Sequence, residues 1–226
     1  MLKCQLHSHS SGDADDYIPH TPKQLISKAK ELNYDVLSIT CHRKVIFSKD
    51  LKKYAEKKGI LLIPGCEIEV EKKHVLVINC NKDVTQIKNF DDLRKYKKTN
   101  PNCLIIAPHP FFPTKECLKK DLIDNMDLFD AIEQSWAYVK TKNYNIPAIE
   151  MAKRWKKSIV ATADCHMLKD LNIGYTHIDA PKNTNAIVQA IKENKIQNTT
   201  QAASYFKILN FFITQTLRNF FRKSHN

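Results

Sequence analysis

The chain has 226 residues, of which 42% are hydrophobic and 27% are charged. This composition excludes a wholly disordered chain, and the length fits one domain with a short appendage. The 36 Lys and Arg residues exceed the 24 Asp and Glu residues, and the resulting net charge of +12 attracts anions. Phosphorylated metabolites, nucleic acid and anionic lipid are candidate partners, although a solvated lysine-rich surface gives the same charge.

Short apolar runs alternate with amphipathic segments along the chain. Strands buried on both faces are rich in Leu, Ile and Val, and strands that alternate with helices form a parallel sheet, open or closed. In chain order, the patterns predict strands over 2–6, 36–40, 60–63, 75–78, 104–107, 131–133 and 158–162, and helices over 21–32, 48–58, 84–97, 146–155 and 184–194. Thr21 and Pro22 are typical of a helix start, and Gly59 of a helix end.

Neither export nor a membrane span is indicated by the sequence. No uncharged apolar stretch reaches the ~18 residues of a spanning helix, and the N-terminal residues lack the apolar core of a signal peptide. The seven cysteines are odd in number and no two are spaced C-x-x-C, which argues against a disulfide framework. We therefore expect a cytoplasmic protein with reduced thiols.

Imidazole and carboxyl side chains follow most of the predicted strands directly. Because parallel strands end on one face, where α/β proteins build their sites, we expect these side chains to meet there. Imidazoles combined with carboxylates suit Zn, Mn or Fe, and one carboxylate can bridge two ions. Eight candidates are too many for one tetrahedral ion and suit two or three divalent ions. The candidates are His7, His9, Asp13, His42, Glu67, His109, Asp164 and His166.

Five short motifs occur in the order found in the polymerase and histidinol phosphatase (PHP) family of metal-dependent phosphoesterases. The chain resembles this family over residues 1–195, through LHSHS at 6–10, SITCH at 38–42, IPGCE at 63–67, APHP at 107–110 and TADCH at 162–166. The resemblance implies a distorted seven-stranded TIM-like (β/α) barrel with two or three metal ions at its C-terminal rim. It places the listed histidines, Glu67 and Asp164 on metal-ligand positions, with Glu67 as the bridging carboxylate.

Three positions depart from the family pattern or are ambiguous. Cys41 replaces the Asp that usually precedes the second-motif His, which alters the surroundings of the ligand and not the ligand itself. Asp13, Asp15 and Asp16 compete for the acidic position after the first motif, and the short spacer favours Asp13. Glu133 is the nearest candidate for a further ligand. His74 begins a predicted strand and is therefore expected at the end remote from the rim.

The implied reaction is hydrolysis of a phosphate ester by a metal-activated water. We expect Glu67, Asp164 and His166 to carry catalysis. Arg43 follows His42 directly and is a candidate for binding the substrate phosphate, with a surface charge as the alternative. Cys41, Cys66 and Cys165 neighbour ligands, but adjacent strand residues point to opposite faces, so we expect them to be packing residues.

The composition changes near residue 200. Residues 203–226 contain no Asp or Glu, and six aromatic residues recur there near helical period together with basic residues. We expect a domain over 1–198 followed by a basic aromatic helix within 199–226. This helix could pack over the open side of the barrel or in a dimer, lie on a membrane surface, or bind nucleic acid or a protein.

Four functions are open at this point. A phosphoesterase acting on a phosphorylated small molecule or nucleotide is favoured. The net charge of +12 motivates a single-strand nuclease or DNA-repair accessory. Cys41 motivates a barrel that binds a metal or an anion without catalysis. Hydrolysis of a carbon–nitrogen bond is the fourth, because amidohydrolase barrels also use His-x-His.

Overall fold

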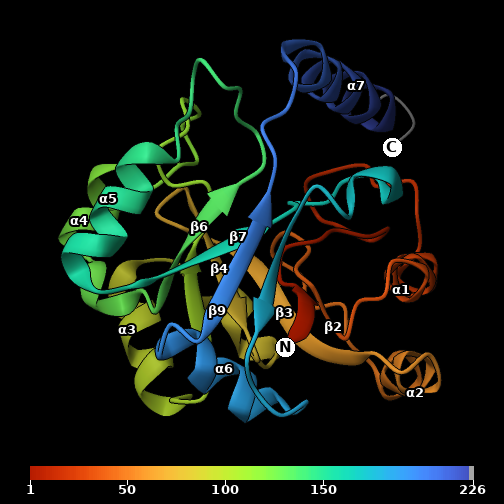
Figure 1. The fold of residues 1–226 in the computed structure, drawn as a ribbon, viewed down its shortest axis with the longest axis horizontal. Coiled ribbons are helices and arrows are strands. Elements are labelled where there is room, and N and C mark those ends of the chain that lie inside the picture. The colour runs from red at the N-terminus through yellow and green to blue at the C-terminus, as the bar shows by residue number, and fades with distance from the viewer. Residues whose placement is uncertain (224–226) are drawn as a thin grey trace.

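A nine-stranded sheet curls into a nearly closed barrel with helices around it (Figure 1). The computed structural model describes residues 1–223, and the side chains of residues 1–220. Hydrogen bonding gives the strand order β7-β6-β5-β4-β3-β2-β1-β8-β9. The strands are β1 (Leu2–Gln5), β2 (Val36–Ile39), β3 (Leu61–Val70), β4 (Lys73–Ile78), β5 (Leu104–Ala107), β6 (Ala131–Ser135), β7 (Ser158–Thr162), β8 (Gly174–Ile178) and β9 (Ile196–Thr200).

Helices α1 and α2 lie on one side of the sheet and α3, α4 and α5 on the other, while α7 lies across the top in Figure 1. The helices are α1 (Pro22–Glu31), α2 (Lys49–Lys57), α3 (Phe90–Thr99), α4 (Lys120–Asp124), α5 (Ile146–Trp155), α6 (Thr184–Lys192) and α7 (Tyr205–Lys223). Three short 3₁₀ helices are η1 (Lys82–Gln86), η2 (Met126–Leu128) and η3 (Leu168–Asp170). No helix within residues 1–223 is both long and apolar enough to cross a bilayer.

The helix starts follow local hydrogen-bonding chemistry. Thr21 caps α1 by accepting from the backbone N–H of Gln24, whose side chain accepts from the N–H of Thr21 in return. Ser48 caps α2 with a single bond, its hydroxyl accepting from the N–H of Leu51. The apolar stripe of α1 is buried against the sheet, as its spacing predicts.

Side chains bridge the seam between the two edge strands of the barrel. Asn198 on β9 accepts from the N–H of Ala161 on β7 at 3.0 Å and donates to the carbonyl of Ile159 at 2.6 Å. Thr176 on β8 exchanges hydrogen bonds with the backbone of Ala161. The predicted α/β barrel class is therefore confirmed, but the strands number nine in the described residues, and not seven.

The third strand is longer than predicted and changes its partner midway. β3 pairs in parallel with β2 as far as Pro64, and antiparallel with β4 from Gly65 onward. A Cβ at Gly65 would overlap the hydroxyl of Ser38, so glycine permits the close approach of the strands there. The strand predicted over 60–63 is therefore too short, because residues 64–66 continue β3 and Glu67 lies within it.

The sheet is not parallel throughout. β4 runs antiparallel to both β3 and β5, and β8 runs antiparallel to β1 and β9. The first residues of β4 therefore lie at the same end of the barrel as the last residues of its neighbours. The predicted domain boundary at 198/199 falls inside β9, and α7 forms the predicted C-terminal helix; residues 224–226 lie outside the described residues.

Replacing Gly174 with Ala is expected to destabilise the barrel by about 1–3 kcal/mol, a typical cost of overpacking. A Cβ there would overlap the backbone carbonyl oxygen of Thr162, the last residue of β7, and this backbone atom cannot rotate away. Urea unfolding measures the change, with Gln197→Ala on the exposed face of β9 as a control. An unchanged unfolding midpoint for Gly174→Ala would contradict the close approach of β7 and β8.

Candidate metal centre

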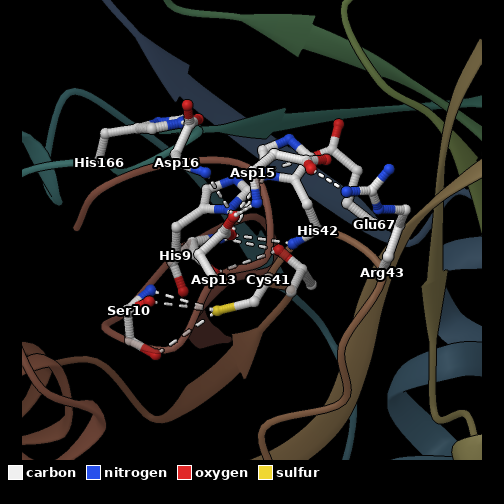
Figure 2. A network of polar contacts seen from close by, with 12 residues as sticks. His9, Ser10, Asp13, Asp15, Asp16, Cys41, His42, Arg43, Glu67 and His166 are labelled. Atoms are coloured by element: carbon white, nitrogen blue, oxygen red, sulfur yellow. Dashed lines mark hydrogen bonds and ion pairs between the residues drawn. The ribbon is translucent and has the colours of Figure 1, made fainter. Parts of the chain in front are cut away.

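Residues from six strands converge at the rim of the barrel beneath α7. His7 and His9 follow β1, His42 follows β2, and Asp164 and His166 follow β7. Isolated bridges between Ser8 and Cys165, and between His42 and Glu67, continue the sheet ladder beyond the strand ends. Figure 2 shows His9, His42, Glu67 and His166 turned toward one another. The structure brings together all eight residues that the sequence singled out as ligands.

Strand alternation separates the imidazoles from the neighbouring thiols. Cys41 and Cys165 are fully buried in the packing against the helices, away from the rim. Burial raises the pKa of the Cys41 thiol to about 12 and also raises that of Cys165. These thiols therefore stay protonated at neutral pH and act as packing residues, as expected from the sequence.

Glu67 lies at the centre of the cluster and is 1% exposed. Its Oε2 is 3.1 Å from Nε2 of His7 and 3.2 Å from Nε2 of His42. Its Oε1 is 2.9 Å from Nδ1 of His74 and 3.5 Å from Nε2 of His109. Burial alone would raise the pKa of this carboxyl, but the surrounding imidazoles, with His7 foremost, hold it well below its usual range. Glu67 is therefore an ionised carboxylate with imidazole nitrogens facing both oxygens.

Asp164 joins the same cluster from the other side. Its Oδ1 is 3.3 Å from Nε2 of His7, 3.2 Å from Nε2 of His9 and 3.4 Å from Nδ1 of His166. The residue has a positive φ of 42°, a backbone conformation that is uncommon for a side-chain-bearing residue and that often marks functional sites. One oxygen is thus shared by three imidazoles, as expected of a ligand-rich site.

Carboxylates behind the imidazoles fix their orientation. Glu133 accepts from Nδ1 of His7 at 2.8 Å, from the N–H of His109 and from the hydroxyl of Thr162. With Nδ1 held in this way, Nε2 of His7 is left facing Glu67 and Asp164. Glu133, which the sequence offered as a possible ligand, therefore lies behind the cluster, where it positions His7.

Asp13 occupies an equivalent position behind two other imidazoles. Its carboxylate contacts Nδ1 of His9 at 2.9 Å and Nδ1 of His42 at 3.0 Å, and it accepts from backbone N–H groups including that of His42. Burial would raise its pKa, but these hydrogen bonds from His42 and His9 lower it. Asp16 instead reaches the pocket, with Oδ2 2.8 Å from Nε2 of His166.

His74 also lies at the rim, so its predicted position at the remote end is wrong. The reason is that β4 is antiparallel to β3, which places the first residues of β4 opposite Glu69 and next to Glu67. Nδ1 of His74 and Oε1 of Glu67 are 2.9 Å apart, yet both are buried without a hydrogen-bond partner because they are not aligned for one. A buried nitrogen and a buried carboxylate oxygen this close, with no hydrogen bond between them, suit a cation bound by both. Each buried polar atom needs a compensating charge or proton.

A pocket of about 240 Å³ opens above the cluster. Aromatic side chains of Phe112, Trp136 and Phe211 line it together with the imidazoles. No Lys or Arg lines the pocket among the residues that the structure describes. Arg43, the expected phosphate ligand, is half-exposed and forms an ion pair with Asp15 outside this pocket (Figure 2).

The donor set fits divalent metal ions. Three groups, each with its ligand atoms within 4.8 Å of one another, can hold an ion: His7, His9 and Asp164; His42, Glu67 and His74; and His9, Asp13 and His42. In the third group the nitrogens that contact Asp13 are Nδ1, while Nε2 of His9 and His42 faces the first two groups. Nitrogen and carboxylate oxygen donors are those of Zn, Mn and Fe sites.

Replacing Glu133 with Gln is expected to lower metal affinity by about 10–100-fold, the usual range for a group that orients a metal-binding imidazole. The amide keeps the shape but loses the charge that holds Nδ1 of His7. Titration with Mn²⁺ or Zn²⁺ by calorimetry measures the change, and Glu150→Gln on α5 is the control. Equal affinity in both variants would show that Glu133 does not orient the site.

The chain belongs to the PHP domain family, whose family model matches residues 3–145. An uncharacterized protein of Methanocaldococcus jannaschii is 28% identical over 118 residues, which cover 52% of this chain and 67% of the relative. The family is that of the predicted motifs, so the resemblance read from the sequence is confirmed.

Solved structures of similar fold include hydrolases of several kinds. A two-domain protein from Bacteroides vulgatus, containing a predicted PHP-like metal-dependent phosphoesterase, aligns with a TM-score of 0.68 at 19% identity over 95% of this chain and 69% of its own. A lesion-specific endonuclease from Pyrococcus furiosus aligns with a TM-score of 0.65 at 16% identity, over 88% of this chain and 58% of its own. An amidohydrolase from Chromobacterium violaceum aligns with a TM-score of 0.57 at 13% identity, over 86% of this chain and 97% of its own. At these identities the likeness shows the shared fold.

Proposed function

We propose that the protein is a metal-dependent phosphoesterase that hydrolyses a phosphate ester at a cluster of two or three divalent ions. The observation that carries this proposal is Glu67, a buried carboxylate whose two oxygens each face imidazole nitrogens from different strands. A carboxylate in that setting suits a bridge between two ions. Membership of the PHP domain family supports the same reaction class.

The donor atoms divide into three candidate ion positions. His7, His9 and Asp164 surround Oε2 of Glu67, while His74 and His109 face Oε1. A third position would use Asp16, His42 and His166 beside the pocket. This assignment replaces Asp13 with Asp16 as the acidic ligand. The carboxylate of Asp13 already contacts Nδ1 of His9 and Nδ1 of His42, on the side of these imidazoles that faces away from the cluster.

Each residue of the site would have a distinct task. When bound, divalent ions would supply an activated water near neutral pH and neutralise charge on the phosphoryl oxygens. Glu133 and Asp13 hold the imidazoles in the orientation that presents Nε2 inward. Asp164 and His166 line the pocket beside the cluster and are placed to hold or move a proton there.

The substrate class is a phosphorylated small molecule, a nucleotide or an oligonucleotide. Phe211 and Phe212 in the pocket lining are partly exposed, and their rings offer aromatic surface on which a base or another flat group can pack. A nuclease is the second candidate, supported by the net charge of +12 and by the similar fold of the Pyrococcus furiosus endonuclease, of which this chain spans 58%.

Phosphate release from a panel of sugar phosphates and nucleotides, and strand cleavage of short oligonucleotides, each with Mn²⁺, with Zn²⁺ and with chelator, test the proposal. Chelator-sensitive turnover that His7→Ala/His9→Ala loses is the expected result. Competition by single-stranded DNA separates the two candidates, since only a nuclease should be inhibited strongly. Tight metal binding without turnover on any substrate would favour a binding protein and contradict the phosphoesterase.

His74→Ala is expected to reduce turnover by about 10–100-fold. Removal of a residue that only orients a metal ligand causes a loss of this size, and removal of a ligand should cost at least as much. The reason is that His74 is the imidazole nearest to Oε1 of Glu67. His177→Ala on β8, which removes an imidazole that does not line the pocket, is the matched control. Full activity of His74→Ala at saturating metal would remove His74 from the centre.

A further inference from the structure

Helix α7 turns an apolar face to solvent. Phe206 is 77% exposed, Leu209 59%, Ile213 50%, Leu217 51% and Phe220 67%. These residues recur at intervals of three and four, so they form one stripe along the helix, which we call the outer stripe. A surface helix of a soluble domain normally buries such a stripe, and exposed apolar patches of this kind mark interaction sites.

The opposite face of α7 holds the helix on the barrel, largely through polar contacts. Asn219 donates to Asp16 at 2.6 Å and accepts from the N–H of Tyr17 at 2.9 Å. Lys207 forms an ion pair with Asp170 at 3.3 Å. Phe211 packs on the ring of His166 at 5.5 Å, edge to face. Because these contacts fix the rotation of α7, the outer stripe is left exposed to solvent.

The charge around α7 indicates what covers the outer stripe. Residues 203–226 contain no Asp or Glu, and Lys207 is already paired with Asp170 on the inner face of the helix. The exposed Lys140 and Lys142 flank Thr141, whose hydroxyl contacts that of Tyr205 at 2.5 Å at the start of the helix. Two copies joined through their outer stripes would bring these like charges together, whereas an anionic surface would neutralise them.

We propose that the outer stripe of α7 docks the protein on an anionic lipid bilayer. The helix would lie in the plane of the interface, with its aromatic and aliphatic side chains among the acyl chains and its basic neighbours near the headgroups. Since the other face of α7 lines the pocket, docking would place the metal centre next to the bilayer surface. The docking surface itself does not depend on the proposed reaction.

Sedimentation of the full chain with vesicles tests the proposal. The vesicles are phosphatidylcholine alone, and phosphatidylcholine mixed with phosphatidylglycerol. We expect the protein to bind the anionic vesicles and not the neutral ones. Binding should weaken as the salt concentration rises from about 0.1 M to 1 M, because the Debye length falls from about 10 Å to 3 Å.

A matched pair of variants locates the surface. Phe206→Ser/Leu209→Ser/Ile213→Ser changes the outer stripe without touching the pocket, and we expect it to weaken binding by more than about 100-fold, since each side chain loses its apolar burial. Ile123→Ser/Ile146→Ser removes two apolar side chains of similar exposure, 46% and 52%, from α4 and α5. This control should bind vesicles like the unmodified protein, and circular dichroism verifies that both variants are folded.

Three results would overturn the proposal. Equal sedimentation of the outer-stripe variant and the unmodified protein would place the membrane contact elsewhere. Equal binding to neutral and anionic vesicles would remove the role of charge. In the third result, the protein binds no vesicles and is a dimer in light scattering, while the outer-stripe variant is a monomer. That result would assign the stripe to a second copy of the chain.

Discussion

Glu67→Gln should lose its bound metal, and its rate of phosphate release should fall by more than about 100-fold. A 100-fold loss is the upper end for residues that only orient a metal ligand, and Glu67 is proposed to be a ligand itself. The amide keeps the shape of the side chain but removes the charge that faces imidazoles on both oxygens. Metal per chain, measured by mass spectrometry after dialysis, and turnover on the best substrate of the panel should fall together.

Glu69→Gln is the matched control for this variant. Glu69 lies two residues further along β3 and is exposed at the surface, so the same change in the same strand leaves the cluster untouched. The control should keep its metal and its activity. Glu67→Gln with full metal content and full turnover would show that Glu67 does not bridge ions.

Removal of the metal should lower the thermal stability of the protein. Ions that bind the folded chain at 100 times their Kd stabilise it by about 2.7 kcal/mol, which corresponds to about 5–10 °C for a domain of this size. The effect should be large here because Glu67, His7 and His9 are buried and, without ions, must rely on protons to offset their charges and lone pairs. Differential scanning calorimetry with and without chelator measures the shift.

The His7→Ala/His9→Ala variant separates ion binding from other effects of the chelator. Its melting temperature should fall less than that of the unmodified protein when chelator is added, because one of the three candidate ion positions lacks two of its ligands. A shift of equal size in the variant and the unmodified protein would locate the stabilising ions at another site.

The convergence of the candidate ligands at one rim was predictable because most of them follow a short apolar strand. The apolar run before Asp164 is a strand buried on both faces, and such a strand can be recognised from its sequence. Its end reaches the rim whatever the order of the strands. His7, His42 and His109 follow the same rule. The bridging role proposed for Glu67 comes from the resemblance to the family, since strand ends alone do not supply it.

Strand direction was not predictable from the apolar runs. Residues 75–78 are equally apolar in either direction, so the antiparallel course of β4 that brings His74 to Glu67 leaves no mark in its composition. The short loop at 71–72 between β3 and β4 was the available signal, since two residues can join antiparallel strands but not parallel ones. β8 was missed because its buried residues alternate with half-buried ones, and β9 was missed because it is mostly polar and none of its residues is buried.

The choice among Asp13, Asp15 and Asp16 depends on three-dimensional packing. Asp13, the first of the three in the chain, contacts an Nδ1 atom on the side of the imidazoles that faces away from the cluster. Asp16, three residues later, reaches the pocket and contacts His166. The orientation of α7 was equally hidden, because a helix with an apolar stripe is ordinarily expected to bury it. Asn219 and Lys207 reverse that expectation through contacts with residues far away in the sequence.

Anomalous X-ray diffraction from crystals grown with Mn²⁺ is the most direct test of the metal centre. The account predicts anomalous density on both sides of the Glu67 carboxylate, one peak toward His7, His9 and Asp164 and another toward His74 and His109. Density at neither position, with metal in the crystallisation solution and the side chains in place, would contradict a metal-dependent site at this rim.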